Sequence, residues 1–160
     1  MHALSDVRGA VRSVFSRPAR AKPRDETGDA RDLASFDTVC QAYEPSGGVT
    51  WAEDLERRWR SVADGRSGSR LIVSREILSF NWRRARWIPM AQFGKDGLSL
   101  KPQFLQVWSE LAGDMDGWEV ASWFASPSAW LDQSRPVDLI DGDLPAVLQA
   151  ARADRFVRVG

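Results

Sequence analysis

The sequence predicts a mainly α-helical protein with a single β-hairpin, and three observations support this fold class. Apolar residues recur at helical spacing in several segments, strict alternation is confined to one segment, and prolines or capping residues stand where helices would begin. We expect a flexible tail over residues 1–33, a helix-turn-helix-like domain with a β-hairpin wing over 34–94, and a small helical bundle over 95–160. Eight tryptophans provide ample core material, because each buries roughly 150–250 Å².

Charge is segregated along the chain, although the formal net charge is zero. Residues 1–24 hold six Lys and Arg against one acid, and residues 25–56 hold nine acids against one Arg. Residues 57–101 hold eleven Lys and Arg against three acids, whereas residues 110–160 hold nine acids against four Arg. A basic middle and an acidic end indicate two surfaces with different partners, and internal charge pairing is the alternative.

The N-terminal region is predicted to be a tail followed by a short helix. Residues 1–33 lack hydrophobic periodicity and are rich in Arg, Asp and Pro, which favours a solvated tail. An i, i+3, i+4, i+7 stripe then predicts an amphipathic helix capped by Ser35. Its apolar positions are Phe36, Val39, Cys40 and Tyr43.

Two further helices and a hairpin follow in the middle of the chain. A capping box of Thr50 and Glu53 opens the clearest helix, over residues 50–62, and the turn ADGRSG follows it. The segment SRLIVSR is predicted to be a second short helix, with Ser69 as its cap.

The period then changes from helical spacing to alternation over residues 77–82, which predicts a β-strand. The polar pair Arg83 and Arg84 separates this strand from a second apolar run, so we expect a β-hairpin closed at the two arginines. Pro89 either ends the second strand or places it at an edge.

Prolines and capping residues mark the helices of the C-terminal part. Pro102 and Pro136 are each predicted at the first position of a helix. Ser126 is predicted to cap a short helix opened by Pro127, and Asp143 to cap the last helix.

The sequence contains no constellation that indicates catalysis, so we expect no enzyme activity and no cofactor. Cys40 and His2 are the sole residues of their types, which excludes His-based triads and cysteine-based zinc sites. Asp114 and Asp116 lack a nearby His, Cys or Lys that would separate their pKa values. The DGD motif at residues 141–143 lacks the further ligands of a calcium loop, which favours a helix cap.

Nucleic-acid binding has more support, because helix, turn, helix and hairpin form the outline of a winged helix-turn-helix. The second helix, with Arg70 and Arg75, would face the major groove. Arg83, Arg84 and Arg86 of the hairpin would lie against phosphates or in the minor groove. The alternative is that these arginines are simply solvated.

The stretch WFASPSAWLDQSRPVDLI, with the acidic turn and helix after it, resembles the toxin-binding domain of Xre/MbcA/ParS-type antitoxins over roughly residues 100–156. The matching positions are Trp123, Phe124, Pro127, Leu131, Pro136, Asp138, Leu139, Ile140, Val147 and Ala151. Where the family commonly has a Gly-Gly or Asp-Gly pair in a tight turn, this chain has Asp132 and Gln133. The family's Thr before the proline is replaced by Arg135.

The resemblance implies a small helical, cytoplasmic protein that neutralises a toxin, often a RES-type toxin that degrades NAD, and that represses its own operon. Its C-terminal part would occlude the active site of the toxin, in a hetero-complex or as a homo-oligomer. The positions expected to contact the partner are Trp130, Asp132, Gln133, Arg135, Asp138, Arg155, Phe156 and Arg158. Core packing is the alternative for Trp130, and simple fraying is the alternative for residues 155–160. A DNA-binding regulator and a protein-binding adaptor without a toxin are the alternatives, and no membrane association is expected.

Overall fold

The computed structural model describes residues 26–62 and 68–160. The chain divides into two units, residues 1–32 and 33–160, and the second contains the sheet and most of the helices. Residues 1–25, the main part of the predicted tail, lie outside the described residues.

The first described helix begins earlier than the sequence predicts. Helix α2 spans Glu26–Tyr43, so Ser35 lies inside the helix instead of capping it, and residues 26–33 are not tail. The segment ETGDARD is rich in acidic residues, which favour the positive N-terminal end of a helix dipole; apolar periodicity does not register this contribution. The predicted apolar stripe of this helix is confirmed, because Phe36, Val39 and Tyr43 are buried.

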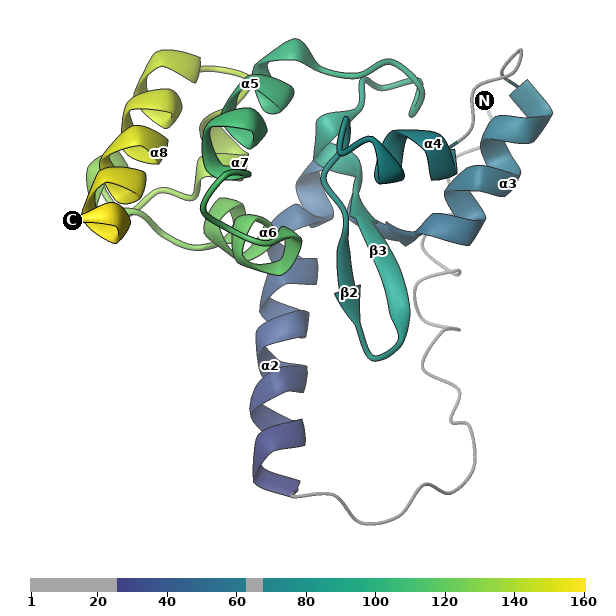
Figure 1. The fold of residues 1–160 in the computed structure, drawn as a ribbon, viewed down its shortest axis with the longest axis horizontal. Helices are drawn as coiled ribbons and strands as arrows, with labels where there is room; N and C mark the ends of the chain where they lie inside the picture. Colours follow the sequence, from purple (N-terminus) through teal and green to yellow (C-terminus); the bar gives the residue numbers. More distant parts are fainter. Residues whose placement is uncertain (1–25, 63–67) are drawn as a thin grey trace. The chain divides into compact units, whose positions relative to one another are not determined.

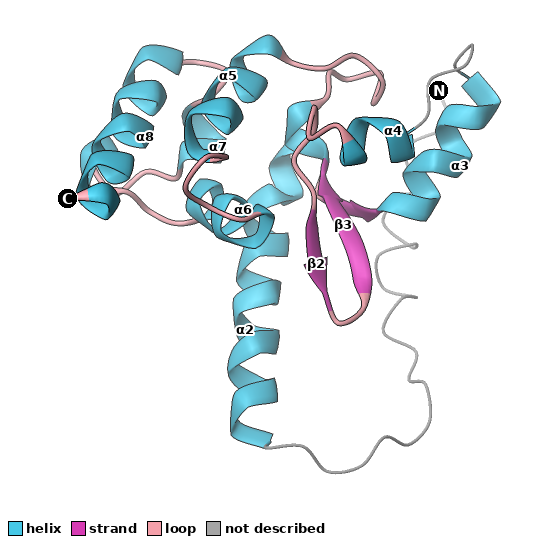
Figure 2. Ribbon diagram, in the orientation of Figure 1, coloured by secondary structure: helices cyan, strands magenta, loops and turns pink. Residues whose placement is uncertain are grey.

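The hairpin is confirmed, and a third strand joins it. Strands β2 (Phe80–Trp82) and β3 (Ala85–Pro89) pair antiparallel, with Trp82 opposite Ala85, so the loop consists of two arginines. Strand β1 (Val49–Trp51) pairs with the other edge of β3, which gives the order β1-β3-β2 (Figure 2). Thr50 therefore lies in a strand opposite Ile88, and the predicted capping box does not exist, because the helix after it begins only at Ala52.

Helices α3 (Ala52–Val62) and α4 (Gly68–Val73) separate β1 from the hairpin along the chain (Figure 1). The order helix, strand, helix, helix, hairpin is that of a winged helix-turn-helix, which agrees with the predicted fold class. The predicted turn between the two helices, residues 63–67, lies outside the described part of the chain. Arg75 lies beyond the end of α4, with a left-handed φ of 56°, so it is not on the helix as expected.

The two faces of the sheet pack against different partners, because successive side chains of a strand point to opposite faces. On one face, Phe36 of α2 stacks on Trp82 with ring centroids 3.9 Å apart and meets Trp87 edge-on at 5.0 Å. On the other face, Ile88 is buried with Leu55 and Trp59 of α3. The small sheet thus stands between α2 and α3.

The C-terminal part is helical throughout. The helices are α5 (Pro102–Leu111), α6 (Gly117–Ala125), α7 (Pro136–Leu139) and α8 (Leu144–Val159), with a 3-10 turn η3 at Ala129–Leu131. Pro102 and Pro136 open their helices and the Asp143 carboxylate accepts a hydrogen bond from the backbone N–H of Ala146, as predicted. Ser126 instead ends α6, because its own backbone N–H closes that helix onto Trp123, and the short helix after it is reduced to η3.

One core joins the regions predicted as separate domains. Phe36 and Tyr43 of α2 belong to the same buried cluster as Phe104 of α5 and Phe124 of α6. The Tyr43 hydroxyl donates a hydrogen bond of 3.1 Å to the carbonyl of Ala121. The remaining short elements are the 3-10 turns η1 (Glu44–Ser46) and η2 (Met90–Gln92). Among the described helices, none combines the length and the apolar character that crossing a bilayer requires.

Candidate functional site

Trp130 is the most exposed of the tryptophans in the C-terminal part, and its side chain is held in place. It lies in η3 with 59% of its surface exposed. Its indole Nε1–H donates to Asp154 Oδ1 at 2.9 Å, and the indole of Trp123 donates to Asp154 Oδ2 at 2.7 Å. Because one carboxylate of α8 holds both indoles, the exposed ring of Trp130 has little rotamer freedom to lose when a partner binds.

The turn after Trp130 has the backbone geometry that glycine favours. Asp132 and Gln133 are consecutive residues with left-handed φ values of 52° and 66°. The Gln133 N–H donates to the carbonyl of Ser128, and the Ser128 N–H donates to that of Ser134, so the turn closes on itself. Both side chains at its tip are exposed. The turn therefore forms without a glycine, and it presents a carboxylate and an amide beside Trp130.

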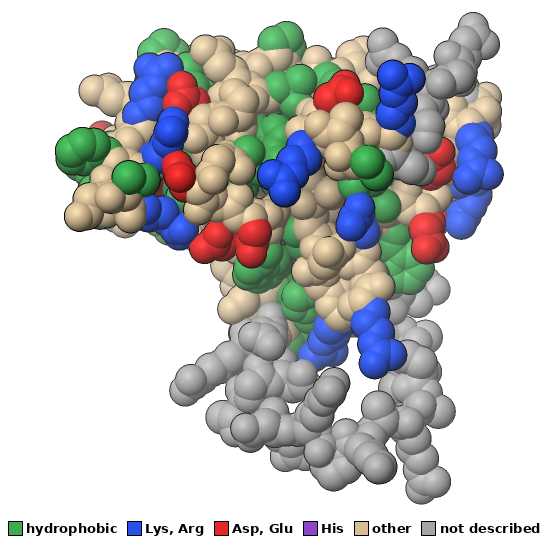
Figure 3. All heavy atoms as spheres, viewed as in Figure 1, with side chains coloured by type: hydrophobic (Ala, Val, Ile, Leu, Met, Phe, Trp, Pro, Cys, Tyr) green, Lys and Arg blue, Asp and Glu red, His purple; other side chains and the backbone are tan. Residues whose placement is uncertain are grey.

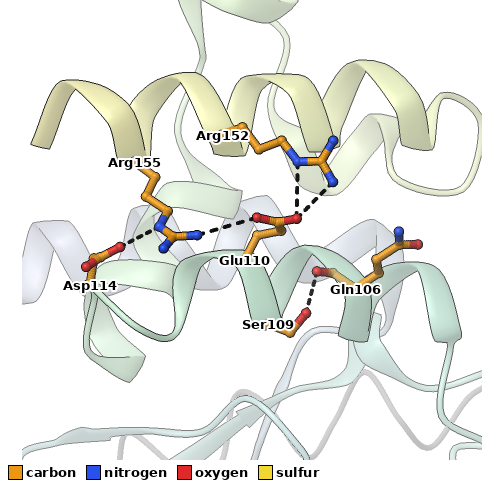
Figure 4. A network of polar contacts seen from close by, with 6 residues as sticks. All are labelled: Gln106, Ser109, Glu110, Asp114, Arg152 and Arg155. Carbon is orange, nitrogen blue, oxygen red and sulfur yellow. Dashed lines mark hydrogen bonds and ion pairs between the residues drawn. The ribbon is translucent and has the colours of Figure 1, made fainter. Parts of the chain in front are cut away.

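The arginines of α8 are engaged in ion pairs within the chain. Arg152 and Arg155 both reach Glu110 of α5, at 2.9 Å and 3.7 Å, and Arg155 also pairs with Asp114 at 2.7 Å (Figure 4). One turn later, Arg158 pairs with Glu119 of α6 at 3.1 Å. Of the positions expected to contact a partner, Arg155 and Arg158 thus anchor α8 to the bundle.

Glu119 shows how the start of α6 is tied to this arrangement. It forms a capping box with Asp116, in which each side chain accepts a hydrogen bond from the backbone N–H of the other residue. The N–H of Asp116 and, second, the hydrogen bond from Arg158 hold the pKa of the Glu119 carboxyl below its ordinary value. Asp114 and Asp116, considered above as paired carboxylates, therefore have separate structural roles.

Beyond its arginines, the last turn of α8 is apolar and exposed. Phe156 is 81% exposed, Val157 70% and Val159 71%. Figure 3 shows hydrophobic side chains gathered at the C-terminal end of α8. Val157 follows Asp154 by three residues, which places it on the side of the helix that faces Trp130. We call Trp130 and Val157 the C-terminal apolar surface, because Phe156 and Val159 project from other sides of α8 at 100° per residue.

Two further expected contact residues belong to α7. Arg135 precedes this helix, and its Nε donates to the Asp138 carboxylate at 2.6 Å across one turn. Both side chains remain partly exposed. The pair fixes the entry into α7, and the remaining guanidinium N–H groups and the second carboxylate oxygen stay open to a partner.

The basic residues of the hairpin form a second candidate surface. Arg83 and Arg84 occupy the tip, both with left-handed φ values (46° and 64°), and the guanidinium of Arg83 lies 4.5 Å from the ring centre of Trp82. Arg86 extends from the face of β3 that α3 covers, and its Nε donates to the Asn81 side chain. Basic side chains are visible at the tip in Figure 3. On α4, Arg70 is exposed.

Consecutive left-handed residues are the geometry of a type I′ turn, for which Asn-Gly is the favoured pair. Arginine gains nothing from this conformation, so the backbone of the tip is strained by its own sequence. Residues strained in this way persist where the surrounding structure holds them, and they cluster at functional sites. The tip is therefore a candidate for binding an anionic partner.

No side-chain cluster in the described part of the chain resembles a metal site. Within it, no three His, Cys, Asp or Glu residues come together in the way that metal ligands do. In the DGD motif, Asp143 caps α8 and the Asp141 carboxylate accepts hydrogen bonds from Lys101 and Gln103. Both carboxylates thus have structural partners.

No local sequence pattern indicates the residue that organises the C-terminal surface. Asp154 is 24 and 31 residues from the two tryptophans that it holds, and no local pattern connects them. The exposed Val157 carried a usable signal, because it lies outside the apolar stripe that buries Val147 and Ala151. Apolar residues off the buried stripe of a helix indicate an exposed patch.

Comparison with known proteins leaves the chain without an established relative. No protein-family model matches the sequence, and no curated protein or solved structure is significantly similar to it. The resemblance to Xre/MbcA/ParS-type antitoxins therefore stays a prediction.

Proposed function

We propose that this chain is a cytoplasmic, antitoxin-like protein that binds and neutralises a partner toxin through the C-terminal apolar surface. One observation carries the proposal: Trp130 is 59% exposed, yet Asp154 fixes its orientation. Exposed, preorganised aromatic side chains are the usual anchors of protein interfaces. The partner class comes from the sequence resemblance alone, which suggests a RES-type toxin that degrades NAD.

The arrangement of α8 supports a docking role better than a catalytic one. The ion pairs of Arg152, Arg155 and Arg158 hold the helix against α5 and α6, so its apolar side chains are presented on a stable support. Exposed patches of apolar side chains often mark sites of protein–protein interaction.

Co-expression with the product of the neighbouring gene tests this proposal. Rescue of growth and of the cellular NAD level is expected with the unchanged chain and is expected to be lost with Trp130→Ala. Truncation of an anchoring Trp costs about 2 kcal/mol or more in binding, so Kd of the purified pair should rise about thirtyfold. Val73→Ala is the control, because Val73 is also an exposed apolar residue (81%) but lies on α4. Full rescue by Trp130→Ala, or equal loss with the control, would refute the proposal.

A second function, binding of duplex DNA, is proposed from the hairpin tip. The winged helix-turn-helix order of elements and the retention of arginines in a strained type I′ turn favour phosphate contacts by Arg83 and Arg84. Replacing both by Asn-Gly keeps the turn and removes two cations. We expect weaker binding to a DNA duplex from the chain's own promoter region, with the slope of log K against log salt reduced in magnitude by about 1.8. An unchanged slope would exclude contact by the tip.

A further inference from the structure

We infer that the partner segment that docks on the C-terminal apolar surface is basic as well as apolar. The inference rests on the proposed function, because it assigns chemistry to the segment that this surface receives. Its apolar side chains would pack on Trp130 and Val157, and its Lys or Arg side chains would lie against nearby carboxylates. Three features of the surface lead to this assignment.

The first feature is the charge that remains once the internal ion pairs are formed. The three arginines of α8 are compensated by Glu110, Asp114 and Glu119. Asp132, two residues after Trp130, is exposed, and no ion pair with a described Lys or Arg involves it. The Asp154 carboxylate likewise accepts hydrogen bonds from two neutral indoles, and no ion pair with a described cation involves it. Neither carboxylate is therefore paired with a described cation at the edge of the apolar surface.

The second feature is the direction of α8. Its apolar last turn, which ends at Val159, is also the C-terminal end of the helix. Unsatisfied carbonyl groups there carry a partial negative charge equivalent to about half an elementary charge, which favours cations and disfavours anions. The last turn also carries Arg158, which is paired with Glu119, so the carbonyl groups add to the attraction of the two carboxylates for a cation.

The third feature is the exposed face of the Trp130 ring. An indole attracts cations to its face, and the attraction adds to that of a nearby carboxylate. Arg suits such a site especially, because its planar guanidinium stacks on an aromatic ring while it donates to carboxylate oxygens. An acidic or phosphorylated segment would be repelled, so the same features disfavour nucleic acid at this surface.

A peptide-binding experiment with the full chain tests the inference. The probes are two fluorescent amphipathic helical peptides of equal length, one built from Leu and Lys and the other from Leu and Glu. We expect saturable binding of the Leu/Lys peptide, weakened by salt, and at least tenfold weaker binding of the Leu/Glu peptide. Trp130→Ala and Val157→Asp should each raise Kd for the Leu/Lys peptide at least tenfold.

Val73→Asp is the matched control for Val157→Asp, because both replace an exposed valine of a helix and Val73 lies on α4. It should leave Kd within twofold of that of the unchanged chain. Asp132→Asn should weaken the salt dependence without unfolding the chain, since Asn tolerates the left-handed backbone. Equal binding of both peptides would overturn the inference, and so would an effect of Val73→Asp as large as that of Val157→Asp. Self-association of the chain in sedimentation experiments that Trp130→Ala abolishes would also overturn it.

The two proposals fail in distinguishable ways. Neutralisation of the toxin by an Asp132→Lys variant with unchanged Kd for the toxin would leave the antitoxin function standing and exclude a basic partner segment. Selective binding of the Leu/Lys peptide together with no binding of the neighbouring gene product would support the surface chemistry and refute the antitoxin function.

Discussion

Replacing Arg83 and Arg84 by Asn-Gly should stabilise the protein while it weakens any contact with DNA. Both arginines have left-handed φ values, 46° and 64°, in a two-residue hairpin loop. The left-handed conformation costs a residue with a Cβ atom roughly 1–2 kcal/mol in conformational free energy. Asn or Gly at the same position avoids most of that cost. A gain in stability would therefore show that Arg83 and Arg84 are not the residues that stabilise this turn best.

The expected gain is a difference of opposing contributions. Relief of backbone strain at two positions contributes about 2 kcal/mol at the conservative end of the range. Loss of the Arg83 guanidinium over Trp82, 4.5 Å from the ring centre, costs about 0.5 kcal/mol at an exposed site. The greater freedom of glycine in the unfolded chain costs about 0.5 kcal/mol more. The net gain of about 1 kcal/mol corresponds to a rise in Tm of about 3–5 °C.

Urea unfolding followed by circular dichroism measures this difference, with a check that the m-value is unchanged. Arg86→Asn is the control, because it removes a cation of the same hairpin from a paired strand position without left-handed backbone. It should not stabilise the protein. A midpoint for Asn-Gly at or below that of the unchanged chain, with equal m-values, would show that the tip is not strained.

Three further predictions follow from single residues. Gly117→Ala should destabilise the protein by about 2 kcal/mol or more in urea unfolding, because the new Cβ would lie 2.0 Å from the carbonyl oxygen of Ser79. Gly113→Ala is the control and should be nearly neutral, because its new Cβ would have no atom within 4 Å. Gln133→Gly should raise the free energy of unfolding by about 1 kcal/mol, because φ is 66° there; a loss of stability would contradict this geometry. Cys40 should react with a thiol reagent at pH 8 about 100-fold more slowly than a thiol of ordinary pKa. The reason is that burial and, second, the Asp37 carboxylate raise the pKa of Cys40 to about 11. A rate typical of a solvated thiol would show instead that Cys40 is accessible and ionised.

Local patterns in the sequence determined much of the fold. The stripe of α2, the hairpin with its two-arginine loop, and the helices opened by Pro102 and Pro136 were all predicted, because each depends on residues within a few positions of one another. The helix-turn-helix-like outline and the helical C-terminal part followed from the order of these segments.

Contacts between distant residues decided the rest. Strand β1 is three residues long, too short to show alternation, and becomes a strand because β3 offers it hydrogen bonds. The sequence left Trp130 open between interface and core; its exposure and its fixed orientation depend on the packing of η3 and on Asp154 in α8. The ion pairs that Arg155 and Arg158 form with α5 and α6 depend on the same kind of distant contact, whereas their contact with a partner stays a prediction. Periodicity reports the environment of a residue within its own element, whereas ion pairs and shared hydrogen bonds depend on which elements the fold brings together.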